Sequence, residues 1–184
     1  MKEPALHEIG ENGAIQNFMA DITQHARDSN GFVLEIGPGW GTGSTLAIQR
    51  GLAEHPRPLH ISVDQADQLR WRPEVSWWHL VIGDSRQIRT MMEAGRIAKD
   101  RRPGLIFIDT DHNYRQMAAE LVVWSVAADE DTIWLFHDTH MWGQPNDDMV
   151  RAIESFAGAT DWVYEDFRQQ AHGLGRMRWK HSNA

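Results

Sequence analysis

The feature that most constrains this chain is a run of glycines at every second position, directly after a short apolar segment. Residues 32–34 lead into Glu35-Ile-Gly-Pro-Gly-Trp-Gly-Thr-Gly-Ser44, with glycine at positions 37, 39, 41 and 43. Glycine lets the backbone turn sharply and approach a ligand with no side chain between them. We therefore expect a strand, a ligand-binding turn and a helix, as at the first strand–helix junction of an open α/β sheet.

The spacing of these glycines indicates which class of nucleoside ligand the loop would bind. The dinucleotide fingerprint requires glycine or alanine three positions after its second glycine, but Thr42 and Ser44 occupy that position in the two possible registers. The Gly-Lys-Ser/Thr of a triphosphate loop is also missing. The acidic-x-Gly-x-Gly-x-Gly form instead resembles motif I of class I S-adenosylmethionine-dependent methyltransferases. The resemblance implies S-adenosylmethionine as cofactor, bound at Glu35, Gly37, Gly39, Gly41 and Gly43.

Composition bounds the class of protein. A chain of 184 residues favours a single domain over residues 1–184. The formal net charge of −8 argues against nucleic acid or an anionic membrane as partner, and the absence of cysteine excludes thiolate metal sites and cysteine nucleophiles. Residues 1–8 lack a signal-peptide core, and no apolar run approaches spanning length. We expect a cytoplasmic protein acting on a small molecule, with a homo-oligomer left open.

Apolar strands alternate with amphipathic helices along the chain. The pattern predicts helices at 14–26, 44–52, 87–98, 114–128 and 147–156, and strands at 32–36, 59–63, 77–82, 105–108 and 132–136. Residues 162–164 and 175–179 resemble a final hairpin. Such alternation predicts an α/β fold: a Rossmann-like, doubly wound, mostly parallel seven-stranded sheet with an antiparallel hairpin at one edge.

Acidic residues follow the predicted strands one after another. Because ligands of open α/β sheets bind beyond the carboxyl ends of the strands, these acids should face one site. They are Glu35, Asp64, Asp84, Asp109 and Asp138.

The methyltransferase resemblance implies nucleoside contacts for several of these acids. Asp64 would accept the ribose hydroxyls, with Gln65 near the adenine, and Asp84 with Ser85 would lie beside the adenine amino group. Asp109 would reach the cofactor from the fourth strand. Asp64 and Asp84 could instead be helix N-caps, a common position for aspartate.

Two segments combine carboxylates with imidazoles after neighbouring strands: Ile-Asp-Thr-Asp-His-Asn-Tyr at 108–114 and Phe-His-Asp-Thr-His-Met-Trp-Gly at 136–143. Hard divalent cations prefer oxygen ligands, so Asp109 and Asp138 are candidate ligands for magnesium or manganese. His137 would add a nitrogen and shift the preference toward manganese, iron or zinc. Because adjacent strand residues face opposite sides, His137 and Asp138 can share one ion only if the strand breaks there.

These segments resemble two groups of metal-assisted O-methyltransferases. The catechol group shares Asp109, Tyr114, Asp138 and the Trp-Gly pair at 142–143, but its asparagine ligand is replaced by Thr139. The cephalosporin-hydroxylase-like and macrolide-sugar group, with Asp-x-Asp-His and an acid pair or His-Asp, is closer.

His112 is the candidate general base, since a neutral imidazole can take the proton of a metal-bound hydroxyl. His140 is the second choice, and helix capping is the alternative role of His112. Four other histidines, His7, His25, His55 and His60, are given no role.

The sequence thus predicts O-methylation of a small-molecule hydroxyl, assisted by a divalent metal. Three alternatives stay open at this stage. The first is a methyltransferase that uses no metal, with the two Asp/His segments acting as base and hydrogen-bonding groups. The second is a Rossmann-like hydrolase or phosphoesterase whose metal activates water. The third is a non-catalytic protein that retains the cofactor site.

Overall fold

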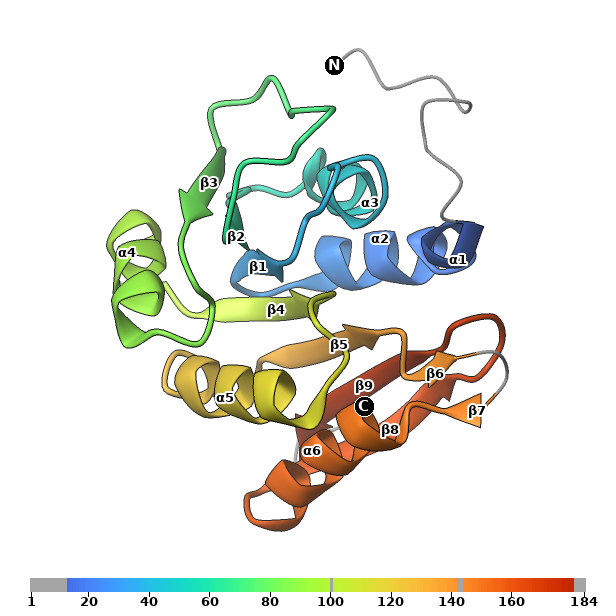
Figure 1. The fold of residues 1–184 in the computed structure, drawn as a ribbon. Helices are drawn as coiled ribbons and strands as arrows, with labels where there is room; N and C mark the ends of the chain where they lie inside the picture. The colour runs from blue at the N-terminus through green and yellow to red at the C-terminus, as the bar shows by residue number, and fades with distance from the viewer. Residues whose placement is uncertain (1–12, 100, 142–143, 181–184) are drawn as a thin grey trace.

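The computed structural model describes residues 13–99, 101–141 and 144–180 of the chain. Its central seven-stranded sheet has the order β3-β2-β1-β4-β5-β9-β8 (Figure 1). The first five strands in this order are parallel, β9 pairs antiparallel with β5, and β8 pairs antiparallel with β9. The predicted fold class is therefore confirmed. The strands are β1 (Phe32–Ile36), β2 (His60–Asp64), β3 (Trp78–Ile82), β4 (Pro103–Ile108), β5 (Ile133–His137), β8 (Trp162–Arg168) and β9 (Leu174–Trp179).

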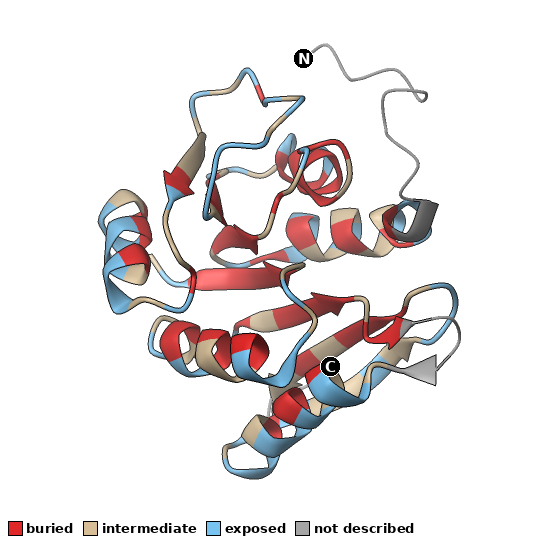
Figure 2. Ribbon diagram, in the orientation of Figure 1, coloured by how far each residue is buried: buried red, intermediate tan, exposed pale blue. Residues whose placement is uncertain are grey.

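Helices cover both faces of this sheet. One apolar core lies between the sheet and α1 (Gly13–Gln16), α2 (Met19–Asp28) and α3 (Ser44–Leu52). A second core lies under α4 (Ile88–Ala98), α5 (Tyr114–Ser125) and α6 (Asp147–Gly158) on the other face. Strands β1 and β4 are buried along their whole length, as Figure 2 shows for β4. In the described part of the chain, no helix is both long enough and apolar enough to span a membrane.

Two local features differ from the prediction. The helix expected at 14–26 is divided into α1 and α2 at Phe18, which has φ −113° and ψ −1°. The ring of Phe18 is fully buried, in edge contact with the imidazole of His137, with centroids 5.8 Å apart. The segment between the predicted strand at 132–136 and the predicted helix at 147–156 contains two short paired strands, β6 (His140–Met141) and β7 (Gln144–Pro145). Residues 1–8 and the Trp-Gly pair at 142–143, used in the predictions above, lie outside the described residues.

The alternation of side chains along β1 decides where Glu35 points. Phe32, Leu34 and Ile36 face the core under α4, α5 and α6, whereas Val33 faces α2 and α3. Since successive strand residues face opposite sides, Glu35 shares the face of Val33 and lies beneath α3.

The carboxylate of Glu35 is fully buried and holds three elements together. It accepts hydrogen bonds from Ser44 (2.6 Å) and Thr45 (2.9 Å) in the first turn of α3, and from Ser62 (2.7 Å) on β2. His60 Nε2 lies 3.1 Å away. Burial alone would raise the pKa of Glu35, but His60 and the hydroxyl donors hold that pKa below its ordinary value. His60, which the sequence left without a role, is thus a fully buried partner of Glu35.

We expect Glu35→Ala to destabilise the protein by about 2–4 kcal/mol, because it leaves buried hydroxyls and an imidazole without their acceptor. Urea unfolding of the metal-free protein would measure this change. Glu130→Ala, at an exposed acid, is the control and should stay within about 0.5 kcal/mol of the wild type. Equal stability of Glu35→Ala and the control would contradict the role given to this network.

Candidate active site

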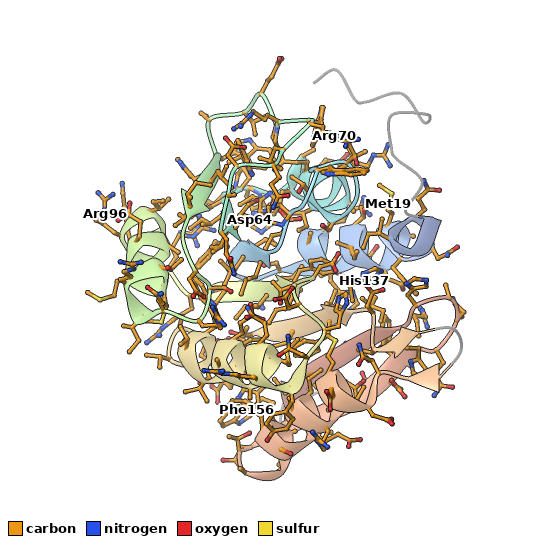
Figure 3. The ribbon with its side chains drawn as sticks, viewed as in Figure 1. Met19, Asp64, Arg70, Arg96, His137 and Phe156 are labelled. Atoms are coloured by element: carbon orange, nitrogen blue, oxygen red, sulfur yellow. The ribbon has the colours of Figure 1, made fainter. Side chains whose placement is uncertain are left out.

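Two adjoining cavities lie at the carboxyl edge of the parallel strands. The smaller, of about 300 Å³, lies over the ends of β1, β2 and β4, and the larger, of about 380 Å³, lies between the glycine loop and the end of β5. Gly37, Gly39, Asp109 and Thr110 line both of them. Figure 3 labels Asp64, at the end of β2, which lines the smaller cavity, and His137, at the end of β5, which lines the larger one. The geometry suits an elongated ligand that extends from one cavity into the other.

The glycine loop needs glycine for two different reasons. At Gly37 (φ 84°) an added Cβ would lie 1.9 Å from the carbonyl oxygen of Asp109, so the loop passes too close to β4 for any side chain. At Gly39 (φ 54°) an added Cβ would meet no atom within 4 Å. The space that a Cβ of Gly39 would occupy is therefore not filled by protein atoms and belongs to the cavities. Gly41 and Gly43 line the larger cavity.

The structure brings some of the predicted nucleoside contacts to the smaller cavity. Asp64, Gln65 and Ser85 line it. The N-cap alternative for Asp64 does not apply, because the next element is a strand, β3. Ser85 is buried and donates a hydrogen bond to Glu120 (2.5 Å).

Two predicted cofactor contacts lie elsewhere. Glu35 is enclosed beneath α3, as described above, and lines neither cavity. Asp84 accepts two hydrogen bonds from the guanidinium of Arg86 (2.9 and 2.8 Å), which lowers the pKa of this carboxyl to about 2. Asp84 also lines neither cavity, and the N-cap of α4 is Gln87. The structure therefore places both acids away from the two cavities: Glu35 lies beneath the loop, and Asp84 is paired with Arg86.

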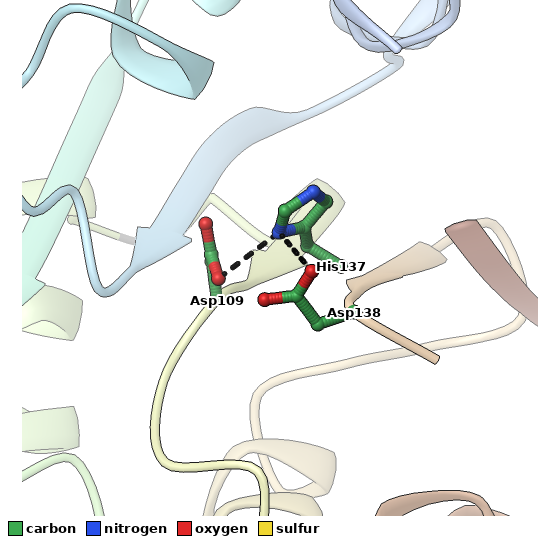
Figure 4. Close-up of side chains that lie close together, drawn as sticks. All are labelled: Asp109, His137 and Asp138. Atoms are coloured by element: carbon green, nitrogen blue, oxygen red, sulfur yellow. Dashed lines mark ion pairs between the residues drawn. The ribbon is translucent and has the colours of Figure 1, made fainter. Parts of the chain in front are cut away.

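Asp109, His137 and Asp138 converge in the larger cavity (Figure 4). Nδ1 of His137 lies 3.2 Å from Oδ1 of Asp109 and 3.3 Å from Oδ1 of Asp138. One ligand atom from each residue can be chosen so that all three lie within 4.8 Å of one another. His137 is 4% exposed, and among the described residues neither of its ring nitrogens has a hydrogen-bond partner of good geometry. Two carboxylates and an otherwise unsatisfied imidazole fit the ligand set of a divalent metal.

The backbone at Asp138 explains how neighbouring residues share this site. Asp138 directly follows the last residue of β5 and has φ 59°, in the left-handed region that aspartate adopts only occasionally. This turn ends the strand alternation, so His137 and Asp138 both reach Asp109. The strand break required by the sequence argument is present.

The carboxylates and imidazoles of the cluster shift one another's pKa values strongly. Burial alone would lower the pKa of His137, but the adjacent carboxylates raise it to about 10. Burial alone would raise the pKa of Asp109, whereas His112 and His137 hold it well below its ordinary value. The pKa of His112 is raised, chiefly by Asp109. In the absence of a metal, a protonated His137 therefore balances part of the negative charge of the two carboxylates.

The two candidate bases differ in position. His112 lines the larger cavity, with Nε2 3.2 Å from Oδ2 of Asp138. It is not the cap of α5, because the side chain of Asn113 accepts the hydrogen bond from the Gln116 amide. His140 is buried, lies 3.7 Å from Asp166 and lines neither cavity. The geometry favours His112.

The sequence reasoning missed two residues of the site. Gln116, on α5, lines the smaller cavity and donates a hydrogen bond to Glu120 (2.6 Å). His172, between β8 and β9, lines the larger cavity with Nδ1 3.0 Å from Oδ1 of Asp138. The predicted edge hairpin was the available signal for His172, because it returns the chain to the end of the fifth strand.

The sequence of residues 8–139, more than half of the chain, matches a family model described as a methyltransferase domain. The chain belongs to this methyltransferase family. The resemblance drawn from the glycine loop is thereby confirmed, and the hydrolase alternative is set aside. No curated protein sequence matches the chain significantly.

Solved methyltransferase structures share the fold at low sequence identity. MycE, from the mycinamycin biosynthetic pathway and solved with Mg and SAH, is 15% identical, with a TM-score of 0.65. The match covers 100% of this chain and 57% of MycE, so the chain spans little more than half of that protein. CalS11, a TDP-rhamnose 3′-O-methyltransferase, is 16% identical, with a TM-score of 0.63 and coverages of 95% and 81%. An O-methyltransferase from Bacillus cereus in complex with SAH is 15% identical, with a TM-score of 0.57 and coverages of 94% and 82%.

We expect Gly39→Val in this methyltransferase to weaken S-adenosylhomocysteine binding by about 100-fold or more. The new side chain would fill the space between the two cavities, and the left-handed backbone would add about 1–3 kcal/mol of strain. Isothermal titration calorimetry would measure the affinity. Gly95→Val is the matched control, because Gly95 lies on α4 with open space around it. Wild-type affinity in Gly39→Val would contradict the assignment of this loop.

Proposed function

We propose that this methyltransferase transfers the methyl group of S-adenosylmethionine to a hydroxyl oxygen of a small molecule, with a divalent metal holding that hydroxyl. The observation that carries the proposal is the convergence of Asp109, His137 and Asp138 in the cavity that the glycine loop also lines. Methyl donor and metal-bound acceptor would then meet in one cavity, which supplies the orientation that the transfer requires.

The cofactor would lie across the shared region of the two cavities. The backbone of Gly37 and Gly39 would pass along its methionine part, and Asp64 in the smaller cavity would accept hydrogen bonds from the ribose hydroxyls. Ser85 and Gln65 line the same cavity and would adjoin the base. Support for this cofactor comes from the family match and from the SAH-bound MycE and Bacillus cereus structures.

Asp109, Asp138 and His137 would hold the metal, which would lower the pKa of a bound hydroxyl. MycE was solved with Mg, which supports a metal in a protein of this fold. The imidazole of His137 makes the ligand set softer than one built from oxygen alone, so manganese should bind more tightly than magnesium. In the metal-free protein, a protonated His137 would offset part of the negative charge of Asp109 and Asp138. A methyltransferase that uses no metal is therefore the alternative, and the experiments below distinguish the two.

His112 would remove the proton from the acceptor hydroxyl. Its Nε2 faces the carboxylate of Asp138 in the larger cavity, with Oδ1 of Asp109 3.7 Å away. A base at this place lies within reach of any group bound between the two carboxylates. The side chain is 27% exposed, so the proton can pass on to solvent.

We expect the protein to bind Mn²⁺ more tightly than Mg²⁺ and to lose methyl transfer after treatment with a chelator. Asp109→Asn and Asp138→Asn should each abolish Mn²⁺ binding, since each removes a charged ligand. Calorimetric titration would measure binding, and release of S-adenosylhomocysteine from a panel of phenols, sugars and nucleotide sugars would measure transfer. Full transfer by the chelated protein would establish the metal-independent alternative.

With an acceptor found in that panel, His112→Ala should lower the turnover number by about 10² to 10⁴, as removal of a general base typically does. Affinity for S-adenosylhomocysteine should change little. The wild-type rate should rise as pH increases through the pKa of His112 in the metal-loaded enzyme, because only the neutral imidazole accepts a proton. His112→Ala should lose this acid limb. Wild-type turnover in His112→Ala, with His79→Ala as the control at a distant strand, would contradict the role.

A further inference from the structure

The turn between β8 and β9 brings a third imidazole to the cluster. His172 lies two positions before Leu174, the first residue of β9, which pairs with His137 at the end of β5. The side chain of His172 is 32% exposed and lines the larger cavity. Its Nδ1 lies 3.0 Å from Oδ1 of Asp138, across 34 positions of sequence.

The chemistry of this contact fixes its direction. An ionised carboxylate only accepts hydrogen bonds, so Nδ1 of His172 must carry the proton and donate it to Oδ1 of Asp138. The other oxygen, Oδ2, remains directed toward Nε2 of His112, 3.2 Å away. Oδ1 also lies 3.3 Å from Nδ1 of His137, so the hydrogen bond from His172 fixes the oxygen that faces the other two residues of the cluster.

The backbone around His172 is itself tied to the end of β5. The carbonyl oxygen of His172 accepts a hydrogen bond from the His140 amide (2.7 Å). An added Cβ at Gly173 would lie 2.6 Å from the hydroxyl of Thr139, so the two segments are in close contact. Asp138, which accepts the hydrogen bond, and Ala171, which precedes His172, both have left-handed backbones, with φ 59° and 56°. The imidazole thus comes from a supported position rather than from a free loop.

We propose that His172 is a positioning residue of the metal centre, which fixes the rotamer of Asp138 so that its Oδ1 is turned toward His137 and Asp109. The inference rests on the proposed function, because it concerns the same metal. Ligating carboxylates depend on such hydrogen bonds for their orientation, and losing one typically weakens metal binding by about 10–100-fold. The edge hairpin of the sheet is then part of the site.

The test measures Mn²⁺ binding in the presence of S-adenosylhomocysteine. The electron paramagnetic resonance signal of free Mn²⁺ reports how much of the metal is unbound. His172→Ala should bind Mn²⁺ about 10–100-fold more weakly than the wild type. His172→Asn should recover most of this loss, because its amide N–H can occupy the place of Nδ1. His79→Ala, which removes a half-buried imidazole from β3, is the matched control. Affinity for S-adenosylhomocysteine should be unchanged in all three variants, which shows that each is folded.

The outcomes separate this inference from the proposed function. If the wild type binds Mn²⁺, Asp138→Asn does not, and His172→Ala binds as tightly as the wild type, the inference is overturned while the metal site stands. An equal loss in His172→Asn and His172→Ala would also overturn the positioning role. If the wild type binds no Mn²⁺, the proposed metal-assisted function fails and the inference fails with it.

Discussion

The buried carboxylate of Glu35 is the interaction on which the cofactor loop depends. It joins β1, the first turn of α3 and β2 through hydroxyl donors and His60, all inside the protein. A glycine-rich turn has little intrinsic preference for one conformation. Because both ends of the turn are fixed to a common carboxylate, the loop can follow a single path between Asp109 and the cavities. The hydrogen bonds of Glu35 thus make the loop rigid from its buried side, and the side of the loop that faces the cavities carries few side chains.

At the other end of the site, the backbone again determines where the functional side chains point. Strand β5 ends in the left-handed turn at Asp138, which directs two neighbouring side chains to one point. Without that turn the sheet would send His137 and Asp138 to opposite faces. The cost of a strained backbone is concentrated where polar groups converge, as is common at functional sites. Parallel strands bring the ligands close together, and one irregular residue brings them into the same cavity.

Much of this arrangement could be predicted from sequence because it follows from general rules of α/β sheets. The glycine spacing, the alternating elements and the acids at the strand ends lead to the mostly parallel sheet with its antiparallel edge hairpin, and to the cluster of Asp109, His137 and Asp138. The positions of Glu35 and Asp84, which line neither cavity, depend on side-chain direction. The period of two along β1 already places Glu35 with Val33, on the face away from Leu34, and this signal was available. The pairing of Asp84 with Arg86 is set by rotamers that the sequence does not specify.

The place of His172 depended on register, because only the pairing of Leu174 with His137 brings the preceding turn beside Asp138. That pairing also bears on how the protein is made. Strand β9 lies between β5 and β8, so β5 keeps an open, apolar edge until residues 174–179 have been synthesised. An open strand edge invites pairing with other chains. When β9 adds to β5, it closes that edge and delivers His172 in the same step. A folding intermediate that lacks this strand therefore has an open edge at β5 and lacks the imidazole of His172 beside Asp138.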